Sequence, residues 1–150
     1  MSAFFAFLHH LAAFMVVSAL AIEHTLIRDS LTLESARRLR RTDSVFGAAA
    51  GVLLVVGLLR VAHFEKGAAY YFHNVFFITK LSLFIVVGLL SILPTIEFIS
   101  WGKALKRGEV PAVAPARLRL VKMLIHAELA GIVLILFCAA FMAKGMGYFG

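Results

Sequence analysis

Four long apolar segments dominate this chain. They cover residues 3–27, 44–62, 75–99 and 120–143, and each is close to the roughly 20 residues that a helix needs to cross a bilayer. A soluble domain of 150 residues could not bury a sequence that is 62% hydrophobic. Within lipid each segment must be helical, because unpaired backbone groups find no water there. The sequence therefore predicts an all-α integral membrane protein, a bundle of four transmembrane helices forming one domain over residues 1–150.

The net charge of +7 is distributed unevenly between the two sides of this predicted bundle. Cytoplasmic loops carry an excess of Lys and Arg, so we expect the more basic side to face the cytoplasm and both termini to lie on the opposite side. We also expect the basic loops to contact anionic lipid, and no nucleic-acid partner. The basic side holds Arg28, Arg37, Arg38, Arg40, Arg41, Lys103, Lys106, Arg107, Arg117, Arg119 and Lys122, against Arg60, Lys66, Lys80 and Lys144 on the other.

The second segment has candidate N-cap residues at its start and is rich in small residues. Thr42 or Ser44 is placed to cap its first turn, which would leave the basic residues before it as a stretch lying at the membrane surface. Gly47 and Gly51 form a GxxxG spacing, which lets a neighbouring helix or a flat ligand approach closely. We expect helix packing to be the use of this spacing.

Polar residues within or beside the apolar segments form two groups by depth. Each ionised side chain at the centre of a membrane helix costs roughly 3 kcal/mol, so such residues point to function. Glu128 approaches mid-membrane, where it must be neutral, paired with a cation or in a polar cavity. The terminal side holds His9, His10, Arg60, His63, His73 and Lys80, and the basic side holds Glu23, His24, Asp43, Glu97, His126 and Glu128.

Histidine in a helical bundle is a common axial ligand of haem iron. Two ligands of one iron must lie at similar depth, whereas His9 and His126 differ by roughly 12 Å in a bilayer. Arg60 and Lys80 lie where haem propionates need cations. The remaining ligand pairs for one iron are His9 or His10 with His63 or His73 on the terminal side, and His24 with His126 on the basic side. Roles without a metal also remain open: His63 and His73 as solvated interfacial residues, and His24 as the partner of a carboxylate.

Other chemistries have weaker support. The chain has no Gly-rich phosphate loop, HExxH or CxxC motif, and Cys138 is its single cysteine. A non-haem metal site would have to draw on Glu23, His24, Glu97, His126 and Glu128, without the Glu-x-x-His spacing of di-iron bundles.

The whole chain resembles an uncharacterised bacterial family of small four-helix membrane proteins, a domain of unknown function. The matching stretches are FLHHLAAF at 7–14, GLLR at 57–60, EKGAAYYFHNVFFITKL at 65–81, LLSILPT at 89–95 and HAELA at 126–130. The resemblance implies a multi-pass protein of the bacterial cytoplasmic (inner) membrane.

The architecture is also similar to that of the HemJ-type protoporphyrinogen oxidases, four-helix proteins that bind b-type haem. The similarity rests on Leu8-His9, on Lys80-Leu81 and on Glu128. The chain departs from that family at Ile78, where the family has histidine, and at a phenylalanine where it has tryptophan. These departures argue against oxidase activity more than they argue against haem binding.

The leading hypothesis is therefore a haem b-binding membrane redox protein acting on a porphyrinogen-like or quinol-type substrate. The candidate iron ligand is His9, with His10 and His73 as competitors. The cations that would hold propionates or an anionic substrate are Arg60 and Lys80. The candidate catalytic residues are Lys80, Glu128 and His126. The alternatives are a small proton-coupled transporter using Glu23, Lys80 and Glu128, and a non-catalytic subunit of a homo-oligomer or larger membrane complex.

Overall fold

The computed structural model describes residues 2–28, 30–64 and 68–149, and among them it contains helices and no strand. The predicted all-α class is confirmed, and the four long helices are apolar enough to cross a membrane. Lys66 of the charge count and the start of the 65–81 motif lie outside the described residues. The elements are α1 (Ser2–Leu26), α2 (Leu33–Leu59), the π-helix η1 (Arg60–Phe64), α3 (Ala68–Phe72), α4 (Val75–Ser100), α5 (Gly102–Lys106) and α6 (Pro115–Ala143).

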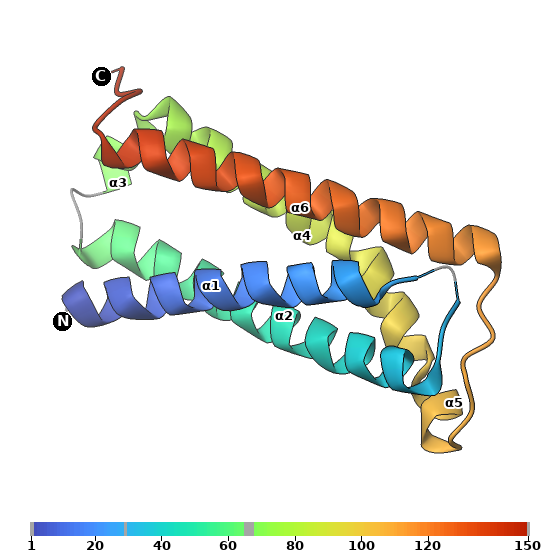
Figure 1. The fold of residues 1–150 in the computed structure, drawn as a ribbon. Coiled ribbons are helices and arrows are strands. Elements are labelled where there is room, and N and C mark those ends of the chain that lie inside the picture. The colour runs from blue at the N-terminus through green and yellow to red at the C-terminus, as the bar shows by residue number, and fades with distance from the viewer. Residues whose placement is uncertain (1, 29, 65–67, 150) are drawn as a thin grey trace.

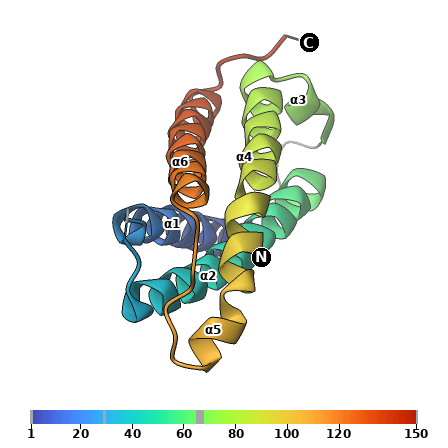
Figure 2. The same cartoon turned by 90° about the vertical axis from the view of Figure 1, so that its right-hand side faces the viewer.

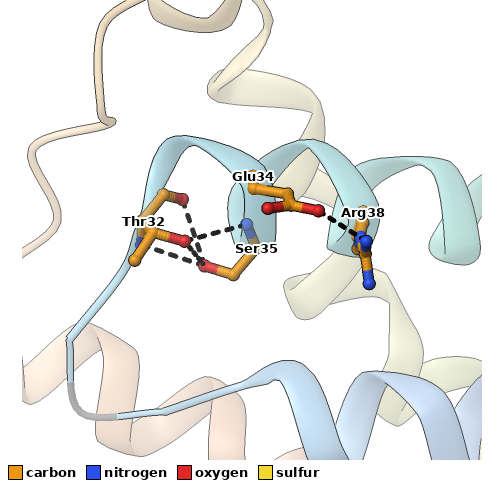
Figure 3. Close-up of polar contacts among 4 residues, drawn as sticks. All are labelled: Thr32, Glu34, Ser35 and Arg38. Atoms are coloured by element: carbon orange, nitrogen blue, oxygen red, sulfur yellow. Dashed lines mark hydrogen bonds and ion pairs between the residues drawn. The ribbon is translucent and has the colours of Figure 1, made fainter.

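Helix α2 begins at Leu33, well before the start expected at Ser44. Thr32 is its N-cap, and Figure 3 shows the reciprocal capping box: the Ser35 N–H donates to Thr32 Oγ1 and the Thr32 N–H donates to Ser35 Oγ. The expected cap at Thr42 or Ser44 is wrong, because the Arg- and Leu-rich stretch before them has good helix propensity and an earlier cap. The basic residues therefore form the first turns of a continuous helix.

The four long helices pack as two antiparallel pairs, α1 with α2 and α4 with α6 (Figure 1). Contacts of α1 with α6 and of α2 with α4 join the pairs, and Figure 2 shows α4 and α6 side by side in the perpendicular view. Figure 1 also shows both termini at one end and α5 at the other. We call these the terminal end, which includes η1 and α3, and the basic end, which includes α5 and the first turns of α2 and α6.

The hydrophobic core is concentrated toward the basic end. Leu20 from α1, Leu39 from α2, Phe98 from α4 and Ile125 from α6 are all completely buried there. The outward faces of all four helices carry large exposed apolar side chains, as expected for surfaces that meet lipid. The tight packing of the basic end leaves the terminal end as the place where the two pairs can enclose a cavity.

Close approach between helices depends on Gly131 of α6. A Cβ added there would lie only 2.5 Å from Val87 Cγ2 of α4, whereas one added to Gly47 or Gly51 would have no neighbour within 4 Å. The prediction that Gly47 and Gly51 bring helices together is therefore wrong for contacts inside this chain. Their spacing places both on an exposed face of α2.

Candidate functional site

A cavity of about 260 Å³ lies at the terminal end between the two helix pairs. Pockets for small organic ligands measure roughly 300–1,000 Å³, so this one is near their lower limit. Its walls are mostly aliphatic and aromatic, its polar groups come from two histidines, one tyrosine, one arginine and one lysine, and no described carboxylate lines it. The lining residues are His9, His10, Ala13, Leu53, Leu54, Gly57, Leu58, Arg60, Val61, Tyr71, Phe77, Lys80, Leu81, Phe84, Ile135, Leu136, Ala139 and Met142.

His9 is the polar residue of this cavity whose hydrogen-bonding capacity is least satisfied. Its side chain is partly buried, and its buried Nδ1 has no partner among the described residues. An imidazole offers a donor or an acceptor at each nitrogen, and a buried one without a partner costs about 1–3 kcal/mol. A ligand in the cavity would recover this cost by engaging the ring.

His10 also lines the cavity, but its ring is arranged differently. Its Nδ1 lies 2.7 Å from the Ala6 carbonyl oxygen, and because a carbonyl only accepts, Nδ1 is the donor. The Nε2 lone pair is then available in the neutral ring, which is the usual tautomer of a metal-binding histidine. His10 is more exposed than His9. His9 is thus the more buried of the two rings that line the cavity, and His10 remains a competing ligand.

Gly57 gives the His9 ring its space. A Cβ at Gly57 would lie 3.2 Å from His9 Cε1 and 3.5 Å from its Nδ1. Any larger side chain on this turn of α2 would therefore press against the imidazole or fill the adjoining cavity. The close approach predicted for small residues on the second helix occurs at Gly57 rather than at the GxxxG pair.

Two cations border the same cavity. Arg60 is the first residue of η1, the π-helical turn that continues α2, and Lys80 projects from α4. Lys80 Nζ lies 5.2 Å from the centre of the Phe77 ring, a cation–π distance, and 4.0 Å from Met142 Sδ. A π-helical turn is frequent at functional sites because it redirects side chains out of the regular helical repeat. An apolar cavity with cations at its border suits an anionic amphipathic ligand.

His63 and His73 do not line this cavity. His73 Nδ1 donates to the Ala69 carbonyl oxygen at 2.7 Å, and its ring packs near Phe149. The chain around it is held by hydrogen bonds from Val75 N to Gly147 O and from Phe149 N to His73 O. His73 is therefore part of the contact between the C-terminal segment and the start of α4.

Deeper in the molecule, three carboxyl groups from three helices gather in the interior. Glu23 of α1, Asp43 of α2 and Glu128 of α6 are 2%, 5% and 1% exposed, and they lie within electrostatic reach of one another. Thr95 of α4 donates to Asp43 Oδ1 at 2.7 Å. Glu23 Oε1 and Glu128 Oε1 have no hydrogen-bond partner among the described residues. This interior acid cluster has the composition of a proton-binding site.

His24 and His126 meet beside this cluster, as the depth argument predicted. Their Nε2 atoms are 2.8 Å apart. His126 Nδ1 donates to Lys122 O, so in the neutral ring its Nε2 accepts from His24. An iron between the two nitrogens would need them about 4 Å apart, at roughly 2 Å for each metal–nitrogen bond. The basic-side histidine pair is thus a hydrogen-bonded pair rather than a preformed haem site.

The structure separates residues that the sequence grouped as one reactive set. Lys80 borders the terminal cavity, whereas Glu128 belongs to the interior acid cluster and His126 faces outward from the opposite side of α6. Within the described part of the chain, no group of three or more His, Cys, Asp or Glu side chains is placed to hold a metal ion. The non-haem metal alternative therefore has no support from the geometry.

Residues 1–147 match a family described as a predicted membrane protein (DUF2214). The chain belongs to this family. No curated protein and no solved structure matches it. The expected membership in a membrane family of unknown function is confirmed, and the similarity to HemJ-type oxidases stays a prediction.

Several residues of the candidate sites in this DUF2214 protein had no distinctive signal in the sequence. Thr95 is an ordinary helix threonine until Asp43 is brought beside it. Glu97 accepts from Trp101 Nε1 at 3.1 Å and from Arg117 Nε at 2.8 Å, and so ties α4 to the start of α6, a role that the sequence did not indicate. Tyr71 and Met142 line the cavity through packing that no local pattern predicts.

Proposed function

We propose that this protein binds haem b in the cavity at the terminal end and acts as a redox protein of the membrane. The observation that carries the proposal is His9: a partly buried imidazole, without a hydrogen-bond partner, beside a glycine in an apolar cavity bordered by Arg60 and Lys80. Haem b would supply one-electron redox chemistry there. His9 would hold the iron, with His10 as the competing ligand.

The remaining residues of the cavity have separate roles in this proposal. The Arg60 guanidinium and the Lys80 ammonium would bind the propionates or an anionic substrate. Phe77 and Phe84 would pack on the flat faces of an aromatic ligand and exclude water. Such a site would accept electrons from a porphyrinogen-like or quinol-type substrate. Glu128 and its neighbours would take up protons deeper in the membrane.

The orientation in the membrane belongs to the same proposal. The basic end would face the cytoplasm by the positive-inside rule, which places the haem cavity and both termini on the opposite side of a bacterial inner membrane. Exposed Gly47 and Gly51 leave a flat face of α2 for a second copy or a larger complex. Reaction of single engineered cysteines with a membrane-impermeant reagent on intact cells would report the orientation.

Filling the cavity beside His9 is expected to prevent haem binding. Gly57→Leu places a branched side chain against the imidazole, which we expect to weaken haem binding by at least about tenfold, as a clash of roughly 1–3 kcal/mol implies. Haem titration of the detergent-purified protein, followed by visible absorption, measures the affinity. Gly51→Leu is the matched control, since Gly51 lies on the same helix and faces open space. Equal affinities in both variants would contradict a haem site at His9.

The interior acid cluster favours a second candidate function, proton-coupled transport. Three buried carboxyl groups from α1, α2 and α6 would bind and pass on protons in such a transporter. If transport is the function, Glu128→Gln abolishes proton-driven uptake into proteoliposomes while the folded fraction stays unchanged. Persistence of uptake in Glu128→Gln would exclude this candidate, and Glu34→Gln, on the exposed start of α2, is the control.

A further inference from the structure

A second cavity, of about 280 Å³, lies at the basic end, far along the molecule from His9. It lies between the first turns of α2 and the short helix α5. Four of its six lining residues are cationic, and no described carboxylate lines it. The lining residues are Arg37, Arg40, Arg41, Ser44, Leu105 and Lys106.

The helical repeat gathers the α2 members of this set. Residues 37, 40, 41 and 44 are spaced i, i+3, i+4 and i+7, which places their side chains on one face of a helix. Because α2 is continuous from Leu33, these residues are held on a rigid element instead of a surface loop. The one-sided basic face is therefore a direct consequence of the earlier helix start.

Helix α5 positions two of the arginines. Arg37 Nη2 donates to the Leu105 carbonyl oxygen at 3.4 Å. A Cβ at Gly102 would lie 3.1 Å from Arg40 Cζ, so the guanidinium of Arg40 packs directly against this glycine. These contacts hold the two guanidinium groups at the cavity wall. Arginine side chains without such contacts would extend into water instead.

No carboxylate among the described residues balances the charge of this cavity. Three other cations of the basic end have carboxylate partners: Arg38 pairs with Glu34, as Figure 3 shows, Arg107 with Glu109, and Arg117 with Glu97. Among the described residues, the four lining cations form no such pair. Like charges this close repel one another, so an anion between them relieves the repulsion.

We propose that this cavity is a phosphate-binding site, which takes either the phosphate groups of an anionic phospholipid or free phosphate. Arginine forks match phosphate oxygens with paired hydrogen bonds, and a lysine adds a point charge. Basic pockets between membrane helices commonly hold headgroups with more than one phosphate. The site lies outside the haem proposal and does not depend on it.

The position of the cavity along α2 favours the lipid as the source of phosphate. The helix has 27 residues, a length of about 40 Å at 1.5 Å per residue, whereas the hydrocarbon core is about 30 Å thick. Its apolar part begins at about Ser44, so Arg37, Arg40 and Arg41 lie at headgroup level. Exposed Val45, directly after the cavity, begins an apolar surface along which acyl chains can lie.

Calorimetric titration of the full chain in a neutral detergent tests this site. The probes are tetraoleoyl cardiolipin in mixed micelles, dioleoyl phosphatidylcholine in the same micelles, and inorganic phosphate. The test variant is Arg40→Gln/Arg41→Gln, and the matched control is Arg38→Gln/Arg107→Gln, which removes the same charge from residues that already have carboxylate partners. Thermal unfolding of each variant confirms that it is folded.

We expect the wild type to bind cardiolipin more tightly than phosphatidylcholine. The test variant should lose roughly 25-fold in cardiolipin affinity, at about fivefold for each cation, and the control should stay within about twofold. If inorganic phosphate alone shows the same variant dependence and cardiolipin adds nothing, the ligand is free phosphate. Equal losses in test and control variants, or binding of neither cardiolipin nor inorganic phosphate by the wild type, would overturn the proposal.

Discussion

His9→Ala is expected to abolish the absorption bands of bound haem b. The imidazole is the partly buried group of the terminal cavity that has no hydrogen-bond partner, and alanine removes the only ligand that this position can offer to iron. Without the imidazole, only the Arg60 and Lys80 cations would hold haem, loosely and in solvent-like surroundings. Visible spectra of the purified variant, oxidised and reduced, measure the effect.

Two matched variants make this result specific to His9. His10→Ala removes the neighbouring ring, which hydrogen-bonds to Ala6, and His73→Ala removes a ring that contacts the C-terminal segment. Both should retain haem at the wild-type ratio to protein. Loss of the bands in His10→Ala with retention in His9→Ala would transfer the ligand to His10, whose Nε2 lone pair the structure already leaves available. Retention of the bands in both His9→Ala and His10→Ala would contradict haem binding at this cavity.

Gly131→Ala is expected to lower the free energy of unfolding by about 1–3 kcal/mol. The new Cβ would lie 2.5 Å from Val87 Cγ2, closer than real side chains approach, so α4 and α6 must move apart or Val87 must leave its rotamer. Unfolding in a denaturing detergent, followed by helical circular dichroism, measures the loss. Gly47→Ala and Gly51→Ala are controls in open space and should be neutral or stabilising by up to about 1 kcal/mol.

A double variant distinguishes a steric clash from a general effect of replacing glycine. Val87→Ala alone should destabilise the protein, because Val87 is buried between α4 and α6. Combined with Gly131→Ala, it removes the clashing methyl group, so the double variant should be more stable than the sum of the two single effects predicts. Simple additivity would show that the close packing of α4 and α6 at Gly131 is not what stabilises the pair.

The sequence was sufficient for the four spans because the cost of exposing a backbone in lipid leaves one local solution, the helix. It was insufficient for the start of α2. The stretch before Ser44 is polar, and a polar stretch is compatible with a surface loop or a helix; the capping box of Thr32 and Ser35 decides in favour of the helix. The difference matters for function, since it creates the basic face of Arg37, Arg40 and Arg41.

The candidate sites, like the fold, could be predicted from the sequence only in part. The depth of each residue in the membrane can be calculated from its number, so His24 and His126 were correctly placed at a similar level, but as possible iron ligands and not as the hydrogen-bonded pair that the structure shows. Which helices pair, and which faces they turn inward, depends on packing between segments far apart in sequence. For that reason Lys80 and Glu128 were assigned to one reaction but lie in different sites, and the role of Gly57 beside His9 was missed.

Two sites at opposite ends of one small membrane protein imply a division of tasks. The terminal cavity offers an apolar space with an imidazole, and the basic-end cavity offers cations at headgroup level. The interior acid cluster lies nearer the basic end, since Asp43 stands in α2 between Arg41 and Ser44, which line the basic-end cavity. In our account the first would carry the redox chemistry and the second would bind phosphate at the membrane surface.

The central claim is haem b binding, and the most direct test is an oxidised-minus-reduced visible spectrum of the wild-type protein. The protein would be expressed with a haem precursor supplied and purified in detergent. Our account predicts sharp haem b bands at a fixed ratio of haem to protein. A folded, monodisperse and colourless protein would contradict it.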